Sequence, residues 1–142
     1  MHSVRFSILA LAACASLAQA KPAGEEHWRA GSTTATAITG DIRLSPTRLV
    51  AAGQTLRLSV VADLPAYRSI IGTFPARVLK VVNPRRVVMR NGNEFGCNAP
   101  ARWIVVYRKG GQDSLGMDVF DGPDLPKSSD DRGFCASYFY YR

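Results

Sequence analysis

Arginine residues recur along the middle of this 142-residue sequence and are its most suggestive feature for chemistry. Seven lie in segments with the alternating pattern of strands: Arg43, Arg57, Arg77, Arg86, Arg90, Arg102 and Arg108. Neighbouring strands lie about 5 Å apart, so several guanidinium groups would gather on one face and bind phosphate or carboxylate. The alternative is an outer face whose charges keep the protein soluble and block edge-to-edge pairing. The residues predicted to bind an anion are Arg57, Arg86, Arg90, Arg102 and Arg108.

Two of the three cysteines, Cys97 and Cys135, follow the N-terminal segment that we expect to be removed on export. In an oxidising compartment two thiols allow only one intramolecular disulfide. A bridge across about 39 residues would stabilise the fold by about 4 kcal/mol. The spacing lacks the CxxC pattern of a redox centre or zinc site, so a redox or metal-binding pair is the alternative. We predict a structural disulfide that fastens the last strand to the middle of the sheet and closes the fold.

Residues for acid-base or nucleophilic catalysis are scarce. After the N-terminal segment is removed, His27 is the one imidazole base, so neither a Ser-His-Asp nor a Cys-His arrangement is expected. Asp63, Glu94 and Asp118 could converge as the carboxylates of a glycan hydrolase, although nothing in their spacing indicates it. The acidic stretch 118–131 lacks the ligand spacing of an EF-hand and is interpreted as solvated turns. We predict a binding protein without catalytic residues, cofactor or metal.

The sequence ends in an aromatic run, YFYYR, that begins at position 138. On a strand, Phe139 and Tyr141 would share the face of Cys135, and Tyr138 and Tyr140 would take the opposite face. One face is expected to be core. The other could be an interface or a platform for sugar rings, because tyrosine combines apolar area with a polar group. We predict Tyr138 and Tyr140 as interface residues, with an ordinary half-exposed strand as the alternative.

Residues 1–20 have the pattern of an export signal. Arg5 precedes an apolar stretch over 6–17, and the small-x-small motif AQA ends at Ala20. The apolar stretch is too short to stay in a bilayer as a helix, which takes about 20 residues. Cleavage after Ala20 is favoured; the alternative is lipidation of Cys14, because the LAAC motif resembles a bacterial lipobox. We expect a periplasmic or secreted protein that contacts a membrane only if Cys14 carries a lipid.

The charge is unevenly distributed. The full chain has 18 Lys and Arg against 11 Asp and Glu, a formal charge of +7, and loss of residues 1–20 leaves +6. Residues 41–109 hold twelve bases and three acids, whereas 110–142 hold three bases and six acids. In an exported protein, this basic body favours an anionic envelope component, such as lipopolysaccharide phosphates or peptidoglycan carboxylates. A protein partner, for an inhibitor or assembly factor using the tyrosine face, is the second hypothesis; nucleic acid is not expected.

Short alternating or β-branched stretches recur about every ten residues, without a helical stripe. The expected strands are 32–39, a strand bent at Pro46 over 42–50, 55–61, 77–82, 86–90, 101–108, 114–120 and 134–141. Asn91-Gly92 and Gly110-Gly111 predict turns, and 64–75 could be a lid, a crossover or a short strand. This pattern predicts an all-β fold, a small antiparallel barrel or sandwich of seven to eight strands closed by one disulfide. One domain over 32–142 would follow a flexible arm over 21–31.

Three stretches of the sequence resemble a group of small exported proteobacterial proteins. They are STTATAITGDIRLSPTRL from Ser32, the NGN of positions 91–93 ahead of Cys97, and CASY from Cys135. The resemblance spans most of the chain after the signal and implies bacterial origin and an envelope location. It brings no catalytic or binding residue with it. We therefore predict, from the residues themselves, an exported binding protein for an anionic envelope ligand.

Overall fold

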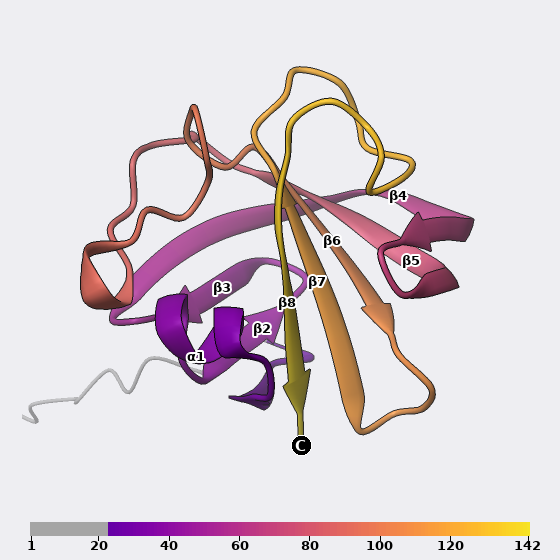
Figure 1. Cartoon of the computed structure of the whole chain (residues 1–142), viewed down its shortest axis with the longest axis horizontal. Coiled ribbons are helices and arrows are strands. Elements are labelled where there is room, and N and C mark those ends of the chain that lie inside the picture. The colour runs from indigo at the N-terminus through magenta and orange to yellow at the C-terminus, as the bar shows by residue number, and fades with distance from the viewer. Residues whose placement is uncertain (1–22) are drawn as a thin grey trace, which may run out of the picture.

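Eight antiparallel strands follow one another in chain order and close into a barrel in a computed structural model that describes residues 23–142 (Figure 1). The elements are β1 Glu26–Ala30, α1 Thr33–Ile38, β2 Ile42–Ser45, β3 Arg48–Ala51, β4 Gln54–Ser69, β5 Gly72–Val81, the 3-10 turn η1 Arg90–Gly92, β6 Trp103–Arg108, β7 Ser114–Phe120 and β8 Phe134–Tyr141. The all-β prediction is confirmed, and of its two forms the barrel is correct. None of the helices in the described part of the chain is long and apolar enough to span a membrane. The predicted export signal and Cys14 lie outside the described residues.

The N-terminal part of the barrel differs from the prediction. Residues 26–30 are strand β1, which pairs with β2 on one side and with β8 on the other, so the predicted arm over 21–31 is wrong for these residues. Trp28 is the physical reason, because its ring is 1% exposed and packs in the core. The predicted strand over 32–39 is helix α1: Ser32 Oγ accepts the Ala35 N–H at 3.1 Å, and this cap outweighs the weak helix propensity of the threonines.

The segments flanking Asn91-Gly92 also depart from the prediction. Residues 86–90 do not join the sheet: their backbone pairs with residues 93–95, through Met89 N–H to Asn93 O at 2.7 Å and Phe95 N–H to Val87 O at 2.9 Å. The expected turn is present, with positive φ at Asn91 and Gly92. Val87 and Met89 are buried and Val88 is exposed, so the side chains alternate although the segment is not a strand of the barrel.

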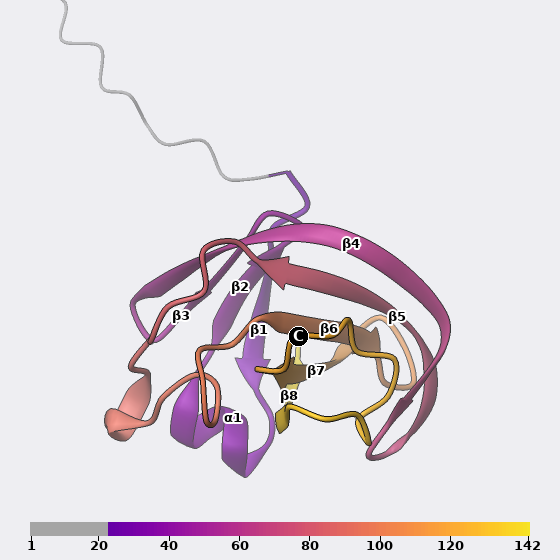
Figure 2. The same cartoon turned by 90° about the horizontal axis from the view of Figure 1, so that it is seen from above.

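The β4–β5 hairpin occupies the region whose structure the sequence left open. β4 is 16 residues long and pairs with β5 along the hairpin, with bulges between Val60 and Ala62 and between Leu64 and Tyr67. Figure 2 shows β4 as a long arch whose far end curls down together with β5. Bulges increase local twist and bend a strand, so residues 64–75 become the curled end of a hairpin.

Two apolar cores result from this bend. The first fills the barrel and contains Trp28, Ile104 and Met117. The second lies on the other face of β5, β6 and β7 and contains Val105 and Tyr107 with residues of the hairpin end. Because neighbours in β6 belong to different cores, both faces of this strand are buried. The hairpin end therefore serves as the cover for the outer side of the sheet.

A buried carboxylate connects the hairpin end to the sheet. Asp118 on β7 is fully buried; its oxygens accept hydrogen bonds from Tyr67 Oη and Ser137 Oγ, each at 2.6 Å, and from Tyr107 Oη at 3.4 Å. Tyr67 comes from β4, Tyr107 from β6 and Ser137 from β8, so the Asp118 side chain ties β7 to three other strands. Burial raises the pKa of Asp118, although the hydroxyl donors oppose the shift.

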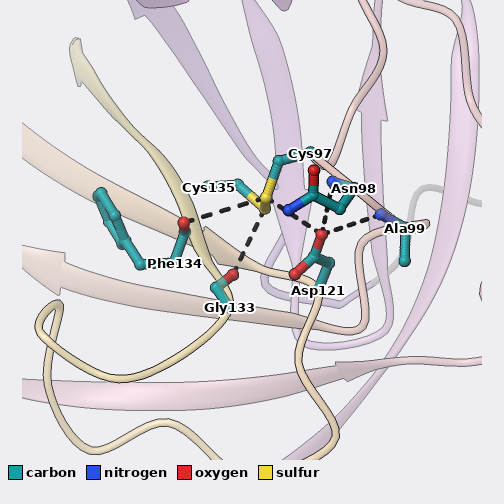
Figure 3. The surroundings of a disulfide bond; sticks show 7 residues. All are labelled: Cys97, Asn98, Ala99, Asp121, Gly133, Phe134 and Cys135. Atoms are coloured by element: carbon teal, nitrogen blue, oxygen red, sulfur yellow. Dashed lines mark hydrogen bonds between the residues drawn. A yellow bond between two sulfur atoms is a disulfide. The ribbon is translucent and has the colours of Figure 1, made fainter.

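The predicted disulfide is present between Cys97 and Cys135, with their Cα atoms 5.3 Å apart. Figure 3 shows Asp121 beside it, where Oδ2 accepts the backbone N–H groups of Asn98 at 2.8 Å and Ala99 at 2.9 Å. The bond ties the irregular connection between β5 and β6 to the start of β8. The backbone pairing of β1 with β8 also holds the barrel closed.

Replacing both cysteines, in the variant Cys97→Ser/Cys135→Ser, should lower the free energy of unfolding by about 4 kcal/mol, because the unfolded chain regains the entropy of an open loop. The barrel should still form, since β1 pairs with β8 without the bond. Urea denaturation of the oxidised wild type and the variant measures the difference. A variant that is unfolded without denaturant would show that the disulfide is required to close the barrel.

The variant Asp118→Asn keeps the side-chain size and removes the titration. The raised pKa in the folded state means that the stability contributed by Asp118 is full below about pH 4 and declines as the pH rises through that folded pKa. We expect the free energy of unfolding of the wild type, relative to the variant, to fall from about pH 4 to about pH 7. A difference that is constant over this range would contradict the raised pKa.

Candidate functional site

The five arginines predicted to bind an anion do not share one face. Arg86 forms an ion pair with Glu94 in the local hairpin, and Arg90 packs over the backbone of Gly40. Arg108 faces the barrel interior and bonds Glu26 Oε2 at 2.9 Å. The remaining two, Arg57 and Arg102, flank the end of β5: the Val82 N–H bonds the carbonyl of Arg57, and the Val81 N–H bonds that of Arg102.

 A hollow beside Arg102 is the site that best fits the predicted chemistry. Its volume is about 630 Å³. We call it the Trp103 hollow, and its lining includes Ser59, Lys80, Asn83, Arg102, Trp103 and Pro123. Cross-strand pairing sets Lys80 opposite Ser59 on β4 and opposite Trp103 on β6. These three side chains therefore form a row on the outer side of the sheet, since Leu79 and Val81 on either side of Lys80 point into the core.

The charges of the Trp103 hollow are not neutralised by the protein. Lys80 and Arg102 are exposed, and neither has an ion pair within residues 23–142. No carboxylate from the described residues lines the hollow. Six of the other twelve arginines in residues 23–142 differ in this respect, because ion pairs with Asp or Glu hold Arg48, Arg68, Arg77, Arg86, Arg108 and Arg142.

An indole ring forms one wall of the hollow. Trp103 is half-buried, and its Nε1–H donates to the carbonyl of Gly122 at 2.9 Å, which fixes the orientation of the ring. A fixed aromatic surface next to two cations suits a ligand that carries both a ring and an anionic group. A guanidinium and an ammonium each donate charge-assisted hydrogen bonds to phosphate or carboxylate oxygens.

Sequence reasoning identified Arg102 and missed Lys80 and Trp103 as members of a site. The alternation within 77–82 and 101–108 indicates which side chains share a face of each strand. It does not say which residue of β5 lies opposite which residue of β6. The pairing of Lys80 with Trp103 is fixed by the strand register, and a single sequence does not contain that information.

The prediction of Tyr138 and Tyr140 as interface residues is wrong. They are 1% and 2% exposed and belong to the barrel core, where burial raises the pKa of Tyr138 to about 12 and Tyr140 Oη lies 2.7 Å from Thr39 Oγ1. The exposed tyrosine is Tyr141, whose ring lies 5.1 Å from the guanidinium carbon of Arg29. Both faces of β8 carry aromatic side chains, so the pattern alone could not tell which face is the core.

The carboxylates considered for glycan hydrolysis have separate environments. Asp63 bonds Arg77 Nε at 2.8 Å, Glu94 pairs with Arg86, and Asp118 is buried. Strand register places Asp63 and Asp118 on opposite faces of the sheet, since Asp63 aligns through β5 and β6 with Met117, the neighbour of Asp118. These three residues therefore do not form a pair across a shared substrate.

The remaining acidic groups hold backbone. Asp131 Oδ2 accepts the N–H groups of Lys127 at 2.7 Å and Ser128 at 3.1 Å, as expected for turns. One Asp121 oxygen lies within 4.8 Å of the sulfur atoms of Cys97 and Cys135. Those sulfur atoms are bonded to each other, so in the oxidised protein they are not thiolate ligands for a metal.

Comparison with known proteins found no matching family model, no matching curated protein and no matching solved structure. The resemblance to small exported proteobacterial proteins therefore stays a prediction, and function has to be argued from the site.

Proposed function

We propose that the protein binds an anionic glycan of the bacterial envelope in the Trp103 hollow. The observation that carries this proposal is a hollow in which two cations, Lys80 and Arg102, lie beside the fixed ring of Trp103. Among residues 23–142, neither cation has an ion pair and no carboxylate lines the hollow. Phosphate or carboxylate groups of the ligand would accept hydrogen bonds from the two cations. A sugar ring would lie against the indole.

The expected affinity of a single hollow is modest. Hydrogen bonds to charged groups contribute about 1.5–3 kcal/mol each, and association opposes them by several kcal/mol. A small fragment is therefore expected to bind no more tightly than with a dissociation constant of about 1 mM, equivalent to about −4 kcal/mol. Envelope glycans present many copies of the same group, and repeated binding raises the apparent affinity.

The predicted location supports this choice of ligand. The disulfide is compatible with an exported protein, and the export signal predicted over 1–20 would bring the chain into contact with envelope glycans. We propose a periplasmic or secreted protein on these grounds. The second hypothesis, a protein partner at the tyrosine face, loses its structural basis because Tyr138 and Tyr140 are buried.

The variant Lys80→Ala/Arg102→Ala tests the proposed function. It should weaken binding to lipopolysaccharide or to soluble peptidoglycan fragments by at least about tenfold, because it removes both charge-assisted hydrogen bonds. Isothermal titration calorimetry at low and high salt measures the effect, and wild-type binding should weaken as salt rises.

The matched control is Arg43→Ala/Lys127→Ala, which removes the same charge from exposed positions outside the hollow. It should bind within about twofold of the wild type. Equal losses in the two double variants would show that only net charge matters. Absence of wild-type binding to either glycan would also contradict the proposal.

A further inference from the structure

The end of the barrel where β6 and β8 finish and β1 begins holds a compact charged cluster. We call this end the barrel mouth and define it by Glu26, Trp28, Arg108 and Arg142. Glu26 Oε2 accepts from Arg108 Nη2 at 2.9 Å and from Trp28 Nε1 at 3.2 Å, and Glu26 Oε1 pairs with Arg142 Nη2 at 2.8 Å. The guanidinium carbons of Arg108 and Arg142 lie 4.7 and 4.9 Å from the centre of the buried Trp28 ring.

The carboxylate of this cluster is ionised at neutral pH. Burial raises the pKa of Glu26, but hydrogen bonds and charge from Arg108 and Arg142 outweigh it and lower the pKa overall. One negative charge therefore faces two guanidinium groups. The side chains of the cluster therefore carry one positive charge in excess of the negative charge.

One nitrogen of Arg108 is left without a partner. Arg108 Nη1 is buried and has no hydrogen-bond partner among the described residues. Buried donors of this kind are usually satisfied, and a charged donor is the most costly to leave unpaired. The guanidinium is already held by Glu26 and stacked against Trp28, so this unpaired N–H group is fixed in place.

Arg108 lines two adjoining spaces. One has a volume of about 170 Å³ and is walled by Leu44, Leu79 and Val106 together with Glu26. The other is a surface groove of about 480 Å³ between the hairpin end and β6, with apolar walls from Leu64, Pro65, Pro75, Ala76 and Tyr107. Arg77 also lines both spaces. Its ion pair with Asp63 offsets its charge, so Arg77 adds no net positive charge to either space.

We propose that the barrel mouth is a second binding site, specific for a small organic carboxylate with an apolar body. The ligand carboxylate accepts a hydrogen bond from Arg108 Nη1, and the apolar body lies in the groove against Leu64, Pro65 and Pro75. An acid of this kind balances the residual positive charge and satisfies the unpaired donor. This site is separate from the Trp103 hollow and does not depend on it.

The two tryptophans of the sequence allow the sites to be tested separately, because one lies in each. In the variant Trp103→Phe, Trp28 is the remaining indole and lies beside Arg108. Titration with octanoate should change its fluorescence saturably, and acetate should bind at least about tenfold more weakly because it lacks the apolar body. Inorganic phosphate should also bind at least about tenfold more weakly.

Two further variants in the same background identify the residues. Arg108→Lys should weaken octanoate binding by at least about tenfold, because it removes the guanidinium donor, whereas Arg57→Lys on the outer face should leave it unchanged. Pro65→Glu changes an exposed position of the groove and leaves the Arg108 cluster intact. It should also weaken octanoate binding, and this loss of affinity cannot be attributed to altered packing of Trp28. Calorimetry confirms each affinity independently of fluorescence.

The proposal is overturned if octanoate produces no saturable change, if Arg108→Lys binds it as tightly as the parent, or if acetate or phosphate binds as tightly as octanoate. None of these outcomes depends on glycan binding by Lys80 and Arg102. Failure at the barrel mouth and failure at the Trp103 hollow are thus distinguishable.

Discussion

The burial of both faces of β6 and β7 is the constraint on which this structure depends. Their inner side chains fill the barrel, and their outer side chains need a second cover, which the end of the β4–β5 hairpin supplies. The hydrogen bond from Tyr67 to the fully buried Asp118 fixes that cover at its centre. The two bulges of β4 allow the hairpin to change from barrel wall to cover along its length. The Trp103 hollow lies beside the part that is still wall, and the groove at the barrel mouth lies beside the part that is cover.

The two candidate sites differ from the ion-paired arginines elsewhere on the barrel in how completely their charges are paired, more than in net charge. Most acidic side chains bind a particular arginine or hold a turn of backbone, as Glu26, Asp63 and Asp131 do. The cations of the Trp103 hollow are left outside this pairing. At the barrel mouth the pairing is incomplete by a single buried N–H group. The fold therefore gathers basic residues into two small sites. Lys80 and Arg102 lie beside Trp103 in one site, and Arg108 lies between Trp28 and an apolar groove in the other.

The sequence was sufficient for features determined locally or by a single possibility. The disulfide followed from the presence of two cysteines, and β7 and β8 have the predicted bounds because their alternation is regular. Strand β1 could not be recognised from its own residues, because the segment is mostly polar. It is a strand because it pairs with β2 and with β8, and β8 lies at the other end of the sequence. The face of Tyr138 was misjudged because both faces of β8 are covered. The Lys80–Trp103 pair needed the register of three strands, which no local pattern specifies.

Binding of an anionic glycan beside Trp103 can be followed by the two indole N–H signals in a proton–nitrogen NMR titration with a phosphorylated disaccharide. We expect saturable shifts of the Trp103 indole signal and of the backbone amides of Lys80 and Arg102, with the Trp28 indole signal unchanged. Shifts spread evenly over all exposed basic residues, or an unchanged Trp103 signal at saturating ligand, would contradict it.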